Sequence, residues 1–190
     1  MRIFIGITLP DTVKAHLARI QEQLKRSRAD VKWVEPHNLH LTLKFIGEFE
    51  ATGIEKIEHI LTDVAQRHAS FYAQVVSAGA FPSINHPRVI WVGIGKEAER
   101  IQAIAVALET ELTHVGITAE NRPFSAHITL GRVRSEKNKK GLVDSLQRLR
   151  EDVPFLIQEF RVSKLTLFRS TLACGGPVYE TVYEAVLNTA

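Results

Sequence analysis

The chain has 190 residues, of which 45% are hydrophobic and 24% are charged, and its formal net charge is +3 at pH 7. This length and composition are typical of one globular domain with its own core, and they argue against a disordered chain. The small positive charge permits a polyanionic partner without requiring one. We expect a single domain that covers residues 1–190.

The beginning of the chain and its cysteine content bear on the compartment. Residues 2–9 are apolar, but Pro10 and Asp11 stop the run, which is too short to span a bilayer and has no small-residue cleavage site. The chain has one cysteine, Cys174, so an intrachain disulfide is impossible. We therefore expect a cytoplasmic protein with no membrane partner, and a monomer by default.

In the first half, strand-like runs alternate with amphipathic helices. Strands are expected over residues 2–9, 39–46, 71–80 and 88–94, and helices over residues 11–27 and 53–68. In the helix expected first, apolar residues recur every three or four positions, and Asp11 is a plausible N-cap. These apolar positions are Val13, Leu17, Ile20 and Leu24.

The second half continues in the same way and ends in β structure. We expect a helix over 97–114, a strand over 125–133, a basic loop at 134–140, a short helix after it, and strands over 155–169 and 178–187. Several strands are joined by short turns rather than by crossover helices. This arrangement favours an α+β fold with antiparallel pairing over a doubly wound parallel sheet.

A four-residue pattern, His-x-Thr-Leu, occurs twice, beginning at His40 and at His127. Each copy has a proline four residues upstream, Pro36 and Pro123. The interval of 87 residues is too long for a solenoid repeat and suits an ancient doubling. The repeat predicts two pseudo-symmetric lobes with antiparallel sheets and outer helices, and an active-site cleft between them.

Alternation along a strand places the histidine and threonine of each motif on one face. His40 and Thr42 then share a polar face, as do His127 and Thr129. Lys44 has the same parity as His40, so it is a candidate for the cleft wall. The opposite face of the first motif strand is predicted to enter the core with Leu39, Leu41, Leu43 and Phe45.

Two imidazoles and two hydroxyls suit phosphodiester chemistry without a metal. A neutral histidine can take a proton from the nucleophile, while a protonated one gives a proton to the leaving oxygen. Hydroxyls can donate hydrogen bonds to the charged non-bridging oxygens. A zinc site is the weaker alternative, because it needs three or four ligands and neither motif has an adjacent carboxylate or thiolate.

The motifs and their surroundings resemble the two-histidine (2H) phosphoesterase superfamily, and within it the RNA 2′,3′-cyclic phosphodiesterases, also called 2′-5′ RNA ligases. The likeness covers essentially the whole chain. Its most specific segments are residues 1–7, 40–47 and 124–132, together with Leu167-Phe168-Arg169-Ser170 and Gly176-Pro177-Val178-Tyr179.

The resemblance implies metal-independent hydrolysis of an RNA 2′,3′-cyclic phosphate end to a 2′-phosphate, with no cofactor. It implies His40 as proton donor to the leaving 3′ oxygen and His127 as proton acceptor from the attacking water. It also implies Thr42 and Thr129 as phosphate-holding hydroxyls. The partner would be RNA or a nucleotide with a cyclic phosphate.

Arg132 is the cation that the family pattern offers beside the second motif, and it could bind phosphate oxygens bidentately. In a regular strand, however, Arg132 faces away from His127, unless a bulge at Gly131 re-aims it. A surface ion pair is the alternative role. The basic segment 131–140 can either grip the RNA backbone or serve as a solvated loop.

Two other functions remain open. The same histidines can run the reverse reaction, an ATP-independent 2′-5′ ligation of a cyclic phosphate to a 5′-hydroxyl. A non-catalytic nucleotide- or RNA-binding module on the same fold is the other, although both motifs are intact. The residues that choose between transfer-RNA fragments, other RNA and small cyclic nucleotides cannot be identified from the sequence.

Overall fold

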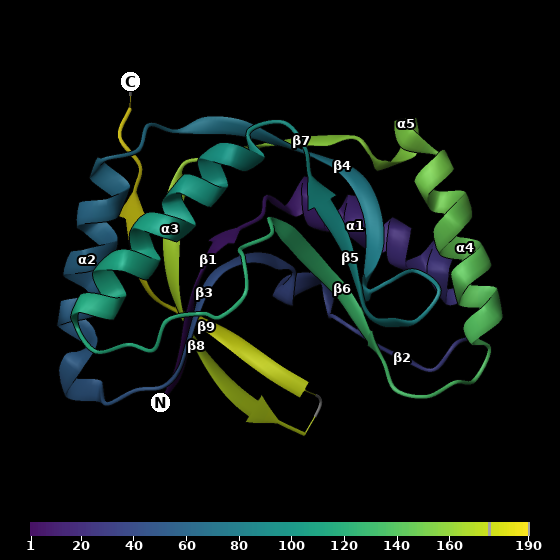
Figure 1. The fold of residues 1–190 in the computed structure, drawn as a ribbon, viewed down its shortest axis with the longest axis horizontal. Helices are drawn as coiled ribbons and strands as arrows, with labels where there is room; N and C mark the ends of the chain where they lie inside the picture. The colour runs from purple at the N-terminus through teal and green to yellow at the C-terminus, as the bar shows by residue number, and fades with distance from the viewer. Residues whose placement is uncertain (175, 190) are drawn as a thin grey trace.

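The computed structural model describes residues 1–174 and 176–189, which form an α+β fold built on antiparallel strands (Figure 1). The strands are β1 (Arg2–Thr8), β2 (Val31–Trp33), β3 (His40–Glu48), β4 (Phe71–Pro82), β5 (Pro87–Ile94), β6 (His127–Val133), β7 (Gln158–Val162), β8 (Lys164–Ala173) and β9 (Gly176–Val186). The α-helices are α1 (Asp11–Lys25), α2 (Ile54–Gln66), α3 (Ala98–His114), α4 (Lys139–Glu151) and α5 (Val153–Leu156), and two short 3-10 helices are η1 (Pro36–Asn38) and η2 (Ala51–Gly53).

The named strands form one sheet in the order β7-β4-β5-β6-β3-β1-β8-β9, with β2 paired to β6. The sheet has two halves, β7-β4-β5-β6 and β3-β1-β8-β9, which meet where Leu41 of β3 pairs with Ile128 of β6. The predicted α+β class with antiparallel pairing is confirmed. The halves correspond to the two expected lobes, but their strands join into one curled sheet instead of two separate ones.

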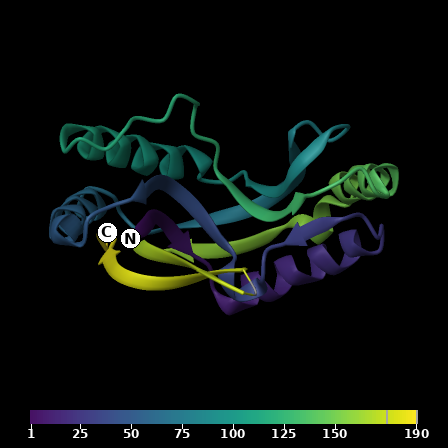
Figure 2. The same cartoon turned by 90° about the horizontal axis from the view of Figure 1, so that it is seen from below.

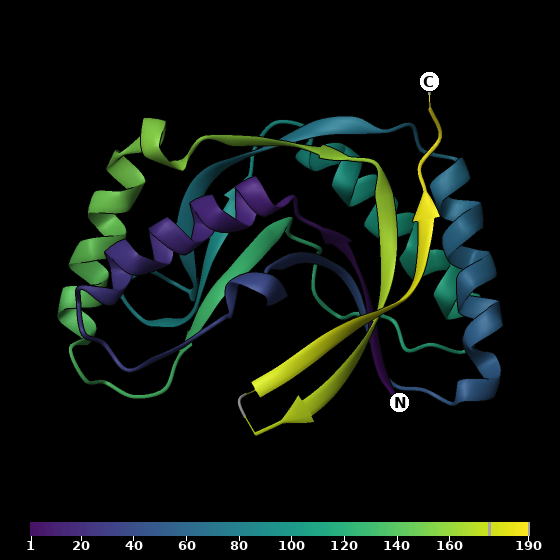
Figure 3. The same cartoon turned by 180° about the vertical axis from the view of Figure 1, so that it is seen from behind.

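The helices cover the outer faces of the two halves (Figures 2 and 3). Helices α2 and α3 pack together over the half that contains β3 and β8, while α1, α4 and α5 lie over the half that contains β4 and β7. Although α1 follows β1 in the chain, it contacts β7, and α3 follows β5 but contacts β3. Each half therefore takes a helix from the other half's sequence, which ties the two together.

The apolar periodicity of the helices correctly predicts their core faces. In α1 the four expected apolar residues are all at most 1% exposed. Asp11 is not the N-cap, because Pro10 occupies that position. Asp11 lies in the first turn, where its negative charge interacts favourably with the positive end of the helix dipole.

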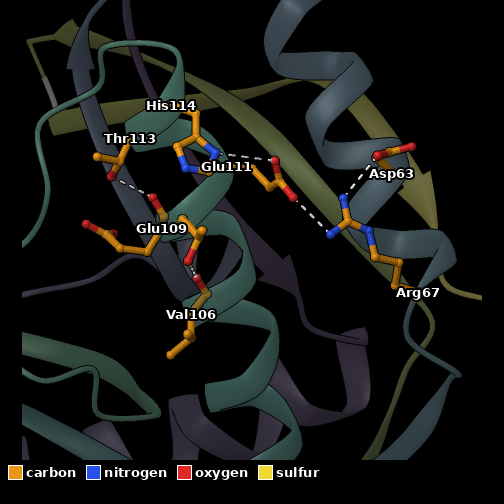
Figure 4. Close-up of polar contacts among 8 residues, drawn as sticks. Asp63, Arg67, Val106, Glu109, Glu111, Thr113 and His114 are labelled. Carbon is orange, nitrogen blue, oxygen red and sulfur yellow. Dashed lines mark hydrogen bonds and ion pairs between the residues drawn. The ribbon is translucent and has the colours of Figure 1, made fainter.

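A surface ion-pair cluster connects α2 and α3. Arg67 bridges Asp63 and Glu111 there (Figure 4).

Short elements escaped the sequence analysis. Strand β2 has three residues, and η1 has three, so neither shows a measurable period. The β structure expected over 155–169 is instead the end of α5 followed by β7 and β8. The remaining strands and helices lie where the sequence places them, with ends that differ by a few residues.

A β-bulge in β3 changes which side chains face the cleft. Ile5 of β1 pairs with Lys44 and Gly6 with Thr42, so Leu43 has no partner in the register. The extra residue reverses the alternation beyond it. Lys44 is consequently 2% exposed and Phe45 is 43% exposed. The prediction that Phe45 enters the core is wrong for this reason. Lys44 is almost fully buried, yet it still lines a cavity together with Thr42 and His127, as its parity with His40 suggested.

Candidate active site

The two motifs meet at the junction of the half-sheets. Because Leu41 and Ile128 pair in an antiparallel register, His40 lies beside the position of Thr129, and Thr42 lies beside that of His127. Leu41 and Ile128 are fully buried on the opposite face. The four polar side chains therefore share one face, in which each imidazole is a neighbour of the other motif's threonine.

The backbone before each motif fixes the tautomer of its histidine. Nδ1 of His40 lies 2.7 Å from the carbonyl oxygen of Asn38, and Nδ1 of His127 lies 2.8 Å from that of Ser125. A carbonyl can only accept, so each Nδ1 carries a proton and donates it. Nε2 is then the nitrogen that gains or loses a proton in each ring.

The environment of His40 is aromatic. Its ring lies 4.8 Å from the ring of Phe4, 5.2 Å from Tyr179 and 5.7 Å from Phe168, measured between centroids. Burial lowers the pKa of His40 below its usual value, and the carbonyl of Asn38 opposes this shift only in part. The neutral ring accepts a hydrogen bond at Nε2 from the Thr42 hydroxyl, 2.9 Å away.

His127 has a similar setting on the other half of the sheet. Its ring meets Phe81 edge-on at 5.1 Å and Trp91 at 6.3 Å. Burial lowers the pKa of His127, and the positive charge of Arg132 lowers it further, while the carbonyl of Ser125 acts in the opposite direction. Both motif histidines are therefore weaker bases than free imidazole.

A second bulge, in β6, brings Arg132 to the histidine face. Ile90 pairs with Gly131 and Trp91 with Thr129, so Leu130 is passed over in the register. Arg132 then lines a cavity together with Thr129. Glycine is needed at 131, because a Cβ there would come within 2.7 Å of a Val31 methyl carbon. The sequence anticipated this bulge as the condition under which Arg132 reaches the site.

The main cavity lies against His40 and has a volume of about 320 Å³, within the usual range for small-ligand sites. Its polar walls include His40, Thr42, Thr129 and Arg132. Its apolar walls include Phe4, Phe45, Leu172 and Tyr179, and the guanidinium of Arg2 lies over the Phe45 ring at 5.0 Å.

Tyr179 is a site residue that sequence reasoning missed, and Phe45 is one that strand alternation assigned to the core. Phe45 occupies the same position after His40 as Arg132 does after His127, and both follow a bulge. Comparing the two repeats at this offset was a signal available in the sequence. Tyr179 comes from the β8–β9 hairpin, and no local sequence pattern predicts that this hairpin folds back over the first motif.

Further cavities adjoin His127. One is lined by His127, Thr42 and Phe45, and another by His127, Thr129 and Arg132. Ser125 and Arg122, in the segment that leads into β6, line both. These cavities adjoin the one beside His40, because one shares Thr42 and Phe45 with it and the other shares Thr129 and Arg132.

A partly buried ion pair connects the first motif strand to the loop before the second motif. Lys44 Nζ lies 2.8 Å from Oε2 of Glu109 and donates to the carbonyl of Thr118 at 2.9 Å. The same carboxylate accepts the backbone N–H of Glu120 at 2.6 Å. Glu109, on α3, thereby anchors the loop that leads to Ser125 and His127.

The basic segment 131–140 contributes to the site mainly through Arg132. Arg132 lines the cavities beside both histidines, whereas Lys139 pairs with Glu136 at the start of α4. Among residues 1–174 and 176–189, no cluster of three or more His, Cys, Asp or Glu side chains could hold a metal ion. In the same residues, no helix combines the length and the apolar character that crossing a membrane requires.

Paired His-x-Thr strands that meet at the centre of a curled antiparallel sheet define a two-histidine phosphoesterase. The family described as LigT like Phosphoesterase matches the chain twice, over residues 7–91 and 92–179, and the chain belongs to that family. Each match contains one of the two motifs, in agreement with the inferred doubling.

Relatives of similar length carry the name RNA 2′,3′-cyclic phosphodiesterase. The one from Methanothermobacter thermautotrophicus is 33% identical, with 94% of this chain and 95% of the relative covered, and the one from Methanocaldococcus jannaschii is 35% identical, with 97% and 99% covered. A crystal structure of a Thermus thermophilus protein superposes with a TM-score of 0.82 at 29% identity, covering 100% of this chain and 99% of that chain. Escherichia coli LigT complexed with 3′-AMP gives a TM-score of 0.72 at 26% identity, covering 99% and 98%.

Proposed function

We propose that this protein hydrolyses the 2′,3′-cyclic phosphate at an RNA 3′ end and leaves a 2′-phosphate. Full-length relatives named RNA 2′,3′-cyclic phosphodiesterase support this activity. The structural observation that carries the proposal is the pairing of Leu41 with Ile128, which brings the two His-x-Thr motifs onto neighbouring strands with each histidine beside the other motif's threonine.

In the proposed reaction His127 is the general base and His40 the general acid. Neutral Nε2 of His127 takes a proton from a water molecule, whose oxygen forms a new bond to phosphorus. The bond between phosphorus and the 3′ oxygen breaks, and protonated Nε2 of His40 gives that oxygen its proton. The phosphate stays on the 2′ oxygen, and each proton transfer is worth about 10²–10⁴-fold in rate.

The lowered pKa of His40 means that its proton has to be supplied when the substrate binds. A phosphodiester anion beside the ring favours the imidazolium and raises the pKa of His40 again. Thr42 and Thr129 donate hydrogen bonds to the non-bridging oxygens, and Arg132 neutralises the charge that they carry in the transition state. Substrate binding thus prepares the acid while His127, beside Arg132, stays neutral.

We also propose that the reaction needs neither metal nor cofactor, and that the protein works as a single-domain cytoplasmic monomer. The two histidines supply both proton transfers of the proposed mechanism. The Arg132 cation supplies the positive charge that the phosphate oxygens require.

The test is product identification on an oligonucleotide with a 2′,3′-cyclic phosphate, incubated with the protein in EDTA. We expect a terminal 2′-phosphate. A product with only a 3′-phosphate, or no product, would reject the proposal.

Adding an RNA with a 5′-hydroxyl measures ligation in the same assay. We expect hydrolysis to dominate in dilute solution because water is in large excess. Binding without turnover would identify a non-catalytic module.

A further inference from the structure

A second groove continues the main cavity on the side away from His127. It has a volume of about 490 Å³ and lies between β2 with η1 and the β8–β9 hairpin, which crosses the lower part of Figure 1. The two spaces share Val34, Arg132, Pro177 and Tyr179 as walls. A ligand in the main cavity therefore has a direct route into this groove.

The positions of the attacking and leaving oxygens determine which part of the RNA enters the groove. In-line displacement requires the attacking water and the leaving 3′ oxygen to lie on opposite sides of phosphorus. If His127 activates the water and His40 protonates the 3′ oxygen, the nucleoside lies on the His40 side. The rest of the RNA leaves that nucleoside through its 5′ oxygen, so it extends away from His127.

The walls of the groove match a nucleotide that carries no sequence requirement. Trp33, Tyr179 and Pro177 provide flat apolar surfaces, which accept any base by stacking. Arg132 lines both spaces. It can therefore contact the cyclic phosphate in the main cavity or the phosphate that links the last two nucleotides. Glu35, on the rim, is the acidic residue among the groove-lining side chains.

We propose that this groove binds the penultimate nucleotide of the RNA, so that the preferred substrate is an oligonucleotide rather than a cyclic mononucleotide. This inference rests on the proposed function and on its assignment of acid and base. It places the body of the RNA against the β8–β9 hairpin and leaves the cavities beside His127 to the nucleophile. In a ligation, the RNA strand with the 5′-hydroxyl would take the place of the water and enter on the His127 side.

The experiment compares kcat/KM for a 2′,3′-cyclic mononucleotide with kcat/KM for the dinucleotide that bears the same terminal nucleotide. We expect the dinucleotide to be favoured by about tenfold, which is within the range for one stacked base. Val178 lines the groove but not the main cavity, and it is 42% exposed, so Val178→Glu is compatible with folding. Its carboxylate would repel the RNA phosphate and bring the ratio close to one.

Val186→Glu is the matched control, because Val186 lies on the same strand, is 60% exposed, and pairs with Lys164 at the far end of the hairpin. It should keep the wild-type ratio. Equal kcat/KM for both substrates in the wild type, or an unchanged ratio in Val178→Glu, overturns the groove assignment while the proposed function stands. If neither substrate is hydrolysed, both proposals fail.

Discussion

Leu41 of β3 pairs with Ile128 of β6, and this contact joins the two half-sheets. Both side chains are fully buried, while the residues on either side of each point into the cleft. The pairing determines the distance between the two motifs, because each histidine neighbours the other motif's threonine. The proposed acid and base thus owe their relative placement to one point of contact between two strands far apart in sequence.

Removing the proposed base should stop turnover without preventing binding. We expect His127→Ala to lower kcat by about 10²–10⁴-fold, since one proton transfer is lost. The affinity for a 2′-phosphate-ended product should change little, because Thr42, Thr129 and Arg132 remain. Initial rates and equilibrium binding measure the two effects. His59→Ala, on the exposed surface of α2, is the control, and equal activity of the two variants contradicts the assignment.

The hydroxyl groups should matter individually. Thr42→Val and Thr129→Val each remove one donor to the non-bridging oxygens, so we expect each to lower kcat by about tenfold, the loss of one hydrogen bond to a charged group. Thr110→Val, on the exposed face of α3, should leave kcat unchanged. If single-turnover rates for either cleft variant equal those of the wild type, that threonine does not touch the phosphate.

The pH dependence should reflect the lowered pKa values of both histidines in the free enzyme. His127 must be neutral, so kcat/KM falls as pH drops below its pKa. His40 must be protonated, so kcat/KM falls as pH rises above its pKa. Both pKa values lie below the usual 6.5, which predicts an optimum of kcat/KM on the acidic side of pH 6.5.

In kcat, which reports the enzyme–substrate complex, the alkaline limb should move to higher pH because bound phosphate raises the pKa of His40. Rates measured from about pH 4.5 to about pH 9 define both profiles, since this range brackets the titration of imidazole. An alkaline limb at the same pH in both profiles would argue against His40 as the acid.

Arg132 should act on both substrate affinity and the base. Its positive charge lowers the pKa of His127, so Arg132→Gln should raise that pKa and move the acid limb of kcat/KM to higher pH. KM should rise as well, because a phosphate contact is lost. Arg132→Lys keeps the charge and should retain the wild-type acid limb while losing bidentate binding. An acid limb that stays in place in Arg132→Gln would separate Arg132 from His127.

Lys44 should be important for stability, because its almost fully buried ammonium pairs with Glu109. Lys44→Met leaves the Glu109 carboxylate without its buried partner, and we expect the free energy of unfolding to fall by about 3 kcal/mol. Chemical denaturation measures this loss. Arg67→Met removes the exposed bridge between α2 and α3 seen in Figure 4, and it should change stability little. Similar stabilities of the two variants would contradict a structural role for the Lys44–Glu109 pair.

The hydrophobic periodicity and the repeated motif predict several helices and strands and the arrangement of the motif side chains from the sequence. The apolar spacing of α1 and the strand character around His40 and His127 depend on local sequence, and the structure places these elements as expected. The same holds for the shared face of each histidine and threonine. Local rules suffice here because a strand's alternation and a helix's period are properties of the backbone itself.

Local alternation could not predict how the strands pair. Two bulges reverse the parity of the residues beyond each motif, which buries Lys44, exposes Phe45 and turns Arg132 to the cleft. A bulge arises from the register between neighbouring strands, and that register depends on partners distant in the chain. Tyr179 reaches His40 for the same reason, because a hairpin near the end of the chain folds over a strand near its beginning. The order of residues alone thus identifies the two histidines and the two threonines, and the resemblance to a known family adds their acid, base and phosphate-holding roles. Their orientation toward one another follows instead from contacts between strands that are far apart in that order.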